Sequence, residues 1–269
     1  MGWIGKIIGG TVGFMFGGPL GMIAGAVFGN VFDHAPRQGS NVRAAFGQKS
    51  NTGSPFTAGN EANSQQQAQM VFFVGAFSML AGIASADGDI SIAERKKVEE
   101  FIRKDLRLDP QSSAIAMKVF ETARASTGLF DQFATQFYDN FRLNRQMMEL
   151  MIDIFYRVSY ADGRLSADEE SLINQAGRIF QVSRERMSTI KHQYGTGKAA
   201  GSSRSFAILG LEPTATNDDI KKTYRRLVSE YHPDKISSKG LPEEFIVFAS
   251  DKFREIQAAY EDLRTSRNF

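Results

Sequence analysis

Apolar residues recur at helical spacing through the middle of the chain, between residues 68 and 193, and no strand-like alternation appears there. Two strongly apolar stretches, residues 70–86 and 145–161, are each followed by an acidic turn and then by an amphipathic segment. This pattern predicts a bundle of helices with the two apolar stretches in its core. The fold class that we expect for the whole chain is all-α.

The central block repeats itself once, at an offset of 75 residues. The letters ADG occupy residues 86–88 and again 161–163, and Ser-x-x-Glu follows in both copies. Ser91 and Ser166, each with a glutamate three residues later, predict capping boxes at the starts of the amphipathic helices.

The first apolar stretch, residues 70–86, is apolar enough to suggest a membrane span. Its counterpart, residues 145–161, carries four charged side chains: Arg145, Glu149, Asp153 and Arg157. Because corresponding positions of a repeat share an environment, we predict that both stretches are buried core helices.

Acidic side chains at the two turns form a weak candidate site for a cation. They are Asp87, Asp89 and Glu94 in the first copy and Asp162, Asp168 and Glu169 in the second. Their spacing does not match the calcium loop D-x-[DN]-x-[DN]-G. The alternative is a tight turn with glycine at positive φ, followed by a helix cap. Both interpretations remain open at this point.

The duplicated acidic turn between helices resembles the tellurite-resistance TerB family. This resemblance implies a compact helical domain over residues 68–193 whose biochemical role is poorly defined. It also implies acidic residues as proposed metal ligands, which keeps the cation site open.

Glycine occurs at every fourth position near the N-terminus: Gly5, Gly9, Gly13, Gly17, Gly21, Gly25 and Gly29. Residues 7–32 carry no charge, and a helix of that length spans the hydrocarbon core of ~30 Å. Glycine weakens a helix in water, but in lipid the Gly-x-x-x-Gly spacing lets two backbones approach closely. We therefore predict one transmembrane helix in residues 1–34, whose glycines form an association face and make the protein a homodimer.

Three alternatives remain open for the glycine-rich segment. The Ala-Gly-Ala sequence at residues 24–26 resembles the cleavage site of a signal peptide. The Gly-Gly-Pro-Leu-Gly sequence at residues 17–21 is typical of a turn, which would make the segment a hairpin within one leaflet. The last alternative is a soluble pair of glycine-rich helices.

The charges that flank the uncharged stretch predict its orientation. Only Lys6 precedes it, whereas three cations follow it: Arg37, Arg43 and Lys49. The positive-inside tendency then places the bulk of the chain in the cytoplasm.

Two segments have the composition of linkers. Residues 35–67 are rich in Gly, Ser, Asn, Gln and Ala, and we expect a flexible tether. A shorter linker, "YGTGKAAGSSR", covers residues 194–204. These linkers separate the helical block, residues 68–193, from a C-terminal block of residues 205–269.

The C-terminal block contains two amphipathic helices. Thr216 predicts the start of the first helix, with Asp219 at the capping-box distance, and Pro233 predicts its end. Its apolar face consists of Ile220, Tyr224, Leu227, Val228 and Tyr231, and its basic face of Lys221, Lys222, Arg225 and Arg226. A second apolar stripe consists of Phe245, Phe248, Ala249, Phe253, Ile256, Tyr260 and Leu263. Packed through these stripes, the helices form an antiparallel hairpin with His232-Pro233-Asp234 at its tip.

The sequence Tyr-His-Pro-Asp-Lys after a basic helix resembles the J-domain of DnaJ-type co-chaperones. The Phe206…Leu209-Gly210-Leu211 start and the "FREI…AYEDL" segment at residues 253–263 resemble it as well. J-domains bind a DnaK-type ATPase and stimulate its ATP hydrolysis. The resemblance implies that His232, Pro233 and Asp234 act at the domain junction of that partner. It also implies that Lys235 and the four basic-face residues contact its acidic surface.

Composition excludes several classes of function. The chain has no cysteine and only three histidines, which excludes disulfides and thiolate metal sites. Its net charge of +2 is too small to indicate a surface that binds nucleic acid. No base–nucleophile pair is visible, so we expect no catalytic residue, no enzymatic activity and no cofactor.

The order of the three parts resembles the membrane-anchored DnaJ-like proteins of Gram-negative bacteria. This resemblance implies a dimeric, single-pass co-chaperone in the inner membrane, with links to envelope-stress or capsule signalling. In the alternative hypothesis the chain is a membrane scaffold that acts through the TerB-like block, with the J-domain as a docking handle.

Overall fold

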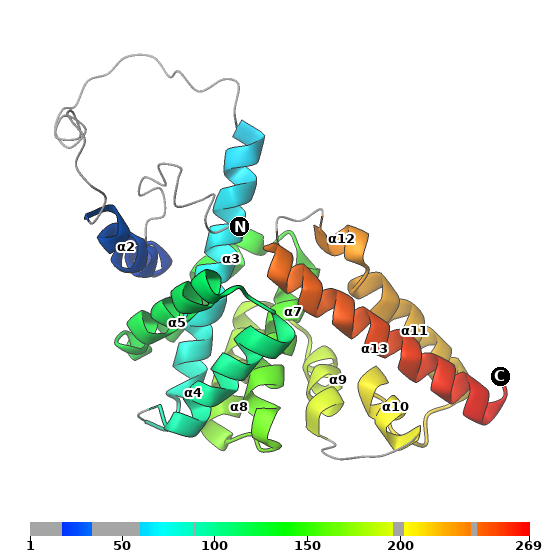
Figure 1. Ribbon diagram of the computed structural model, residues 1–269. Coiled ribbons are helices and arrows are strands. Elements are labelled where there is room, and N and C mark those ends of the chain that lie inside the picture. Colours follow the sequence, from blue (N-terminus) through cyan, green and yellow to red (C-terminus); the bar gives the residue numbers. More distant parts are fainter. Residues whose placement is uncertain (1–17, 34–59, 89, 196–201, 238–240) are drawn as a thin grey trace.

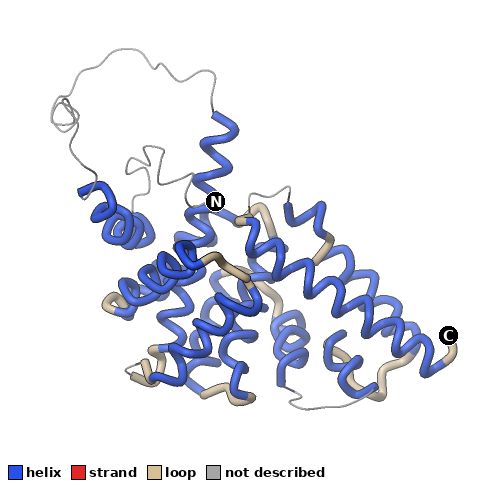
Figure 2. Tube along the Cα trace, viewed as in Figure 1, coloured by secondary structure: helices blue, strands red, loops and turns tan. Residues whose placement is uncertain are grey.

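A computed structural model describes residues 18–33, 60–88, 90–195, 202–237 and 241–269. Every regular element in these ranges is a helix, which confirms the all-α fold class (Figures 1 and 2). Several predictions lie outside the described residues: Gly5, Gly9, Gly13 and Gly17 of the association face, Asp89 of the first acidic turn, and most of the tether.

The helix α3, Asn60–Ala84, runs through the centre of the structure (Figure 1). Every residue from Met70 to Ala84 is buried. Among the described residues, Gln65–Ala84 is the one helical stretch long and apolar enough to cross a membrane, and most of it is buried inside the protein. This confirms the prediction of a core helix. The helix begins at Asn60, so the last residues of the predicted tether are helical.

The other helices of this block pack around α3, and we call residues 60–195 the central bundle (Figure 1). They are α4 (Ile92–Glu100), the π-helical turn η1 (Phe101–Asp105), α5 (Pro110–Arg124), η2 (Thr127–Leu129), α6 (Phe130–Phe141), α7 (Arg145–Ser159), η3 (Tyr160–Asp162), α8 (Ala167–Ile179) and α9 (Arg184–Gly195). The second predicted core helix is α7, which is buried along nearly all of its length.

The two acidic turns have the local structure that the repeat predicts. Gly88 and Gly163 have φ values of 135° and 83°, which residues other than glycine rarely adopt. Ser91 caps α4 and Ser166 caps α8, and each forms a reciprocal capping box with the glutamate three residues later. Glycine at positive φ and the capping boxes are therefore confirmed.

The described part of the predicted transmembrane helix is α2, Gly18–Asp33. In this structure α2 lies against α3, α5 and α6, and it buries Leu20, Ile23 and Val27 there. The Oε1 atom of Gln136 accepts a hydrogen bond from the Leu20 amide at 2.9 Å, and Lys118 Nζ donates to the Val27 carbonyl at 3.1 Å. The central bundle thus buries apolar side chains of α2 that a membrane would otherwise cover.

The C-terminal block forms the hairpin that the two stripes predict. We call residues 202–269 the C-terminal hairpin; it consists of α10 (Ser202–Leu209), α11 (Asn217–Glu230), α12 (Pro233–Ser237) and α13 (Glu243–Arg267). In Figure 1, α11 and α13 lie side by side as an antiparallel pair. Tyr224 stacks on Tyr260 with ring centroids 3.8 Å apart, while Ile220 and Leu227 are fully buried. The first helix of the pair ends before Pro233, as predicted, and Pro233 itself begins the short helix α12, because proline suits the first position of a helix.

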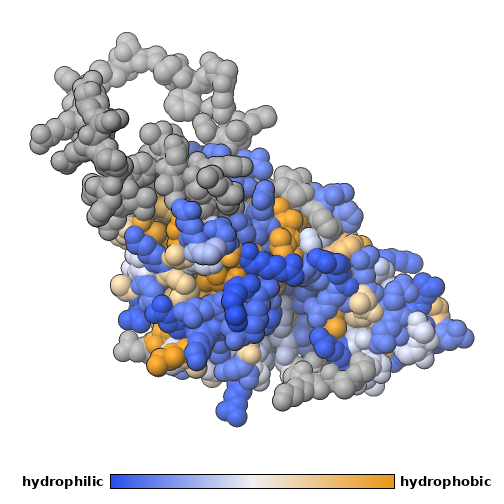
Figure 3. Space-filling view, in the orientation of Figure 1, coloured by the Kyte–Doolittle hydropathy of each residue, from blue (hydrophilic) through white to orange (hydrophobic). Residues whose placement is uncertain are grey.

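The sequence predicted that the second stripe packs against the first one within the hairpin. The structure shows that part of the second stripe also packs against the central bundle. Phe245 at the start of α13 contacts Phe72 of α3, with ring centroids 4.9 Å apart, and Phe248 contacts Phe101 at 5.7 Å. The hairpin and the central bundle therefore share one apolar core. Figure 3 shows that the surface over α11 and α13 on this face is mainly hydrophilic, as expected when their apolar side chains point inward.

Candidate functional site

The tip of the C-terminal hairpin lies between two helices. A capping box formed by Thr216 and Asp219 begins α11, and the helix ends at Glu230. The backbone carbonyl of His232 accepts hydrogen bonds from the amides of Lys235 at 3.0 Å and Ile236 at 3.1 Å. This turn holds the His-Pro-Asp sequence in a fixed backbone conformation at the surface.

The two ionisable side chains of the tip are accessible to a partner. The imidazole of His232 is 42% exposed and lies edge-on to the ring of Phe253, with centroids 5.8 Å apart. Its Nδ1 accepts a hydrogen bond from the Asp234 amide at 3.3 Å. The carboxylate of Asp234 is 91% exposed. Packing on one side orients the imidazole, and its other side stays open to solvent.

The predicted basic face divides into two groups. The exposed Lys222 and Arg225 form no hydrogen bond or ion pair with the described residues. Lys221 lies 4.9 Å over the ring of Phe269, and Lys235 Nζ lies 2.6 Å from the hydroxyl of Ser229. Only part of the predicted face is therefore free for an acidic partner.

Arg226 belongs to the engaged group. Its guanidinium lies 3.0 Å from the carboxylate of Glu230, one helical turn away. The same carboxylate also lies 2.5 Å from the guanidinium of Arg186, on α9 of the central bundle. Arg186 pairs in turn with Glu149 of α7 at 3.0 Å. A chain of charges thus joins the basic face of the hairpin to the interior of the bundle.

The central ion pair of this chain of charges is shielded from solvent. The side chains of Arg186 and Glu149 are each only 5% exposed. Burial alone would lower the pKa of Arg186, but Tyr231, Glu230 and Glu149 together raise it, so the guanidinium remains charged. Burial raises the pKa of the Glu230 carboxyl by more than Arg186 lowers it. Sequence reasoning missed this contact, although the charges within the predicted core helix 145–161 were a signal of buried pairing.

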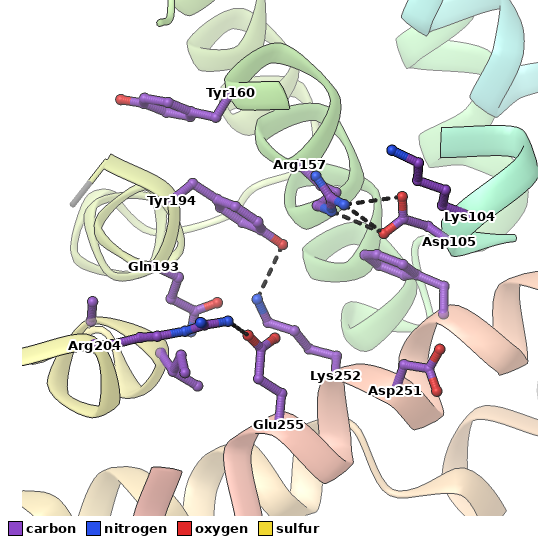
Figure 4. A pocket seen from close by; sticks show the side chains of 13 residues that line it. Lys104, Asp105, Arg157, Tyr160, Gln193, Tyr194, Arg204, Asp251, Lys252 and Glu255 are labelled. Carbon is purple, nitrogen blue, oxygen red and sulfur yellow. Dashed lines mark hydrogen bonds and ion pairs between the residues drawn. The ribbon is translucent and has the colours of Figure 1, made fainter. Parts of the chain in front are cut away.

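A second polar contact crosses the junction between the central bundle and the C-terminal hairpin. The buried Lys252 of α13 donates a hydrogen bond to the hydroxyl of Tyr194 at 3.1 Å (Figure 4). The Nζ atom of Lys252 also lies 3.6 Å from the Asp153 carboxylate. Lys252 and Tyr194 border a groove of about 780 Å³ that lies between the central bundle, α10 and α13. Its walls carry charges of both signs, largely paired within the protein, as in the contact of Arg157 with Asp105.

The acidic turns do not combine into a cation site among the described residues, where no group of three or more possible ligands occurs. The ammonium group of Lys97 lies 3.2 Å from Asp162 and 3.9 Å from Glu169. Glu94 and Glu169 use one carboxylate oxygen for the capping boxes, while Asp87 and Asp168 are exposed. A lysine of the first copy thus neutralises Asp162 and Glu169 of the second turn.

Three family models match the chain, in separate segments. The model of the co-chaperone DjlA transmembrane domain matches residues 1–50, that of the tellurite resistance protein TerB matches residues 74–192, and that of the DnaJ domain matches residues 204–268. By domain content and order, the chain belongs to the DjlA family. The DjlA transmembrane match supports membrane anchoring through the N-terminal segment, and the DnaJ match coincides with the C-terminal hairpin.

Curated relatives extend over nearly the whole chain. Proteins named Co-chaperone protein DjlA are 27% identical in Photobacterium profundum, 28% in Coxiella burnetii and 27% in Escherichia coli K12. The matches cover 98%, 100% and 98% of this chain, and 99%, 99% and 98% of the relatives. No solved structure matches the chain.

Proposed function

We propose that the protein is a membrane-tethered co-chaperone that binds a DnaK-type ATPase through the C-terminal hairpin and stimulates its ATP hydrolysis. The observation that carries this proposal is the backbone-fixed His232-Pro233-Asp234 tip, in which the side chains of His232 and Asp234 are accessible, together with the exposed Lys222 and Arg225 of α11. The DnaJ-domain match over the same residues and the co-chaperone names of the relatives support it.

The geometry suggests different roles for the cations and for the His-Pro-Asp tip of the hairpin. Lys222 and Arg225 attract and orient an acidic surface, because exposed charges act mainly on encounter rates. His232, Pro233 and Asp234 then act at the partner's domain junction. Lys221, Arg226 and Lys235 contribute less to the encounter, since each already has a partner within this chain. None of these residues is catalytic, since the hydrolysed ATP belongs to the partner.

The N-terminal segment determines where this activity takes place. We place the protein in the inner membrane as a single-pass protein with its bulk in the cytoplasm, where the DnaK-type partner and its ATP are found. The glycine spacing supports a homodimer through the membrane helix, which energy transfer between labelled copies in vesicles would test. A role in envelope-stress or capsule signalling belongs to the same proposal, with the central bundle selecting the client.

The test is single-turnover ATP hydrolysis by a bacterial DnaK in the presence of the full chain in detergent. The wild type should accelerate hydrolysis, and His232→Gln should abolish the acceleration. His192→Gln is the matched control, because His192 lies on α9 and pairs with Glu212 at 3.2 Å, away from the tip. Absence of stimulation by the folded wild type would refute the co-chaperone mechanism and favour the scaffold hypothesis.

A further inference from the structure

The contact between the central bundle and the C-terminal hairpin has an apolar and a polar part. Phe245 and Phe248 of α13 supply the apolar part by packing on rings of the bundle. The polar part is the pairing of Glu230 with Arg186, which in turn pairs with Glu149. Glu230 is the last residue of α11 and lies two positions before His232. The bundle therefore holds the chain directly next to the tip.

The polar part of this contact specifies orientation. Burying charges costs hydration free energy, so such a pair adds little stability over apolar packing of the same volume. It does penalise every arrangement in which one member stays buried without its partner. The planar guanidinium of Arg186 has fixed donor directions, and it places two carboxylates from different parts of the chain in defined positions.

Docking leaves the partner-facing side of the hairpin uncovered. Lys222 and Arg225 remain exposed, as does the carboxylate of Asp234. The residues that the bundle covers lie on the other side of the hairpin, at Tyr231, Phe245 and Lys252. An inhibitory contact would cover the basic face. This contact instead leaves Lys222 and Arg225 of that face exposed.

We propose that the central bundle is a docking platform that holds the hairpin in one orientation, with Arg186 as the positioning residue for the His-Pro-Asp tip. Through Glu230, Arg186 fixes the last turn of α11 and hence the direction in which His232 and Asp234 project. The docking itself is independent of any partner. Its effect on a DnaK-type ATPase rests on the proposed function.

The first test measures the docking without a partner. Because the chain has no cysteine, labels can be placed at single sites, here Lys96→Cys on α4 and Gln257→Cys on α13, both exposed. Spin labels at these sites should give one narrow distance distribution in the full chain. Arg186→Met should broaden it, and Arg184→Met, an exposed arginine on the same helix, should not. An unchanged narrow distribution in folded Arg186→Met would overturn the role of Arg186.

The second test measures stimulation of DnaK as a function of co-chaperone concentration. Arg186→Met should lower the maximal stimulation by about tenfold or more, because small misplacements of acting groups are costly. The half-saturating concentration should stay within about threefold of the wild type, since Lys222 and Arg225 still mediate the encounter. Arg186→Lys keeps the positive charge but loses the two-pronged guanidinium, so its maximal stimulation should lie between those of the wild type and Arg186→Met. This variant also provides the test if Arg186→Met does not fold.

A rescue experiment separates positioning from general destabilisation. Arg107 and Asp251 form an ion pair of 2.7 Å across the same junction, at the surface. Cross-linking Arg107→Cys to Asp251→Cys with a short bis-maleimide should restore maximal stimulation in the Arg186→Met background. Failure of this rescue, or stimulation above the wild type in Arg186→Met, would overturn the proposal. If the wild type itself does not stimulate DnaK, the proposed function fails while the distance measurement still decides the docking.

Discussion

Phe245 of α13 lies edge-on to Phe72 of α3, with ring centroids 4.9 Å apart and both rings fully buried. Phe245 therefore belongs to the C-terminal hairpin by sequence and to the central bundle by packing. Because both blocks contribute to one core, we expect them to unfold as a single cooperative unit.

Truncation of this ring should destabilise both blocks together. Phe245→Ala should lower the free energy of unfolding by about 3–5 kcal/mol, the usual cost of removing a buried phenylalanine ring. Urea unfolding followed by far-UV circular dichroism measures the change, and Val247→Ala, half-buried on the same helix, is the control. Two separate transitions in the wild type would contradict a shared core.

The free cations of α11 should govern encounter with an acidic partner. The double variant Lys222→Glu and Arg225→Glu should raise the half-saturating concentration for DnaK stimulation by about tenfold at low salt, because like charges then repel. The difference should shrink as salt is added, since both side chains are exposed. Lys96→Glu with Arg164→Glu makes the same charge change on the exposed surface of the central bundle and should have little effect. Equal effects of the two double variants would argue against a specific face.

The pH dependence of stability should change when Glu169 is replaced. Burial raises the pKa of this carboxyl above 4.5, and its hydrogen bonds with Ser166 and the charge of Lys97 offset this only in part. An acid whose pKa is higher in the folded state stabilises the protein below its unfolded pKa, and this contribution is lost as pH rises through the folded pKa.

Glu169→Gln keeps an acceptor for the capping box but does not titrate. The stability of the wild type relative to this variant should therefore fall between pH 4 and about pH 7. Urea unfolding at both pH values measures the difference, with Glu94→Gln as the control at the equivalent position of the first repeat. A relative stability that rises with pH would contradict the assigned cause.

Membrane insertion and docking of α2 should exclude each other, because Leu20, Ile23 and Val27 cannot be buried in both places. Leu20→Cys and Gln136→Cys should cross-link readily in detergent-free buffer, since the Leu20 amide lies 2.9 Å from the Gln136 side chain. The yield should fall after reconstitution into lipid vesicles. An unchanged yield in vesicles would mean that residues 18–33 do not enter the membrane.

Local features of this chain were predictable from sequence because their causes are local. Ser91 and Ser166 form capping boxes since each has a glutamate three residues later, and Gly163 takes positive φ at a turn. The stacking of Tyr224 on Tyr260 follows from two apolar stripes on adjacent helices. The His-Pro-Asp tip could be placed for the same reason.

Contacts between the blocks could not be predicted, because they depend on an orientation that no local pattern encodes. Phe245 has the spacing of a hairpin residue whether its ring faces α11 or α3. Arg226 has the appearance of a free cation until Glu230 and Arg186 are brought beside it. Lys97 meets Asp162 only after the two copies of the repeat pack together.

The most direct test of the account uses the anchored chain in living bacteria. A photo-crosslinking amino acid at Lys222 should capture the DnaK-type chaperone, and Asp234→Asn should reduce this capture sharply. The same amino acid at Lys96, on the surface of the central bundle, should not capture it. Capture at Lys222 that depends on Asp234 would support the co-chaperone account. Its absence, with the protein present in the membrane, would contradict the claim that the exposed face of α11 receives a DnaK-type partner.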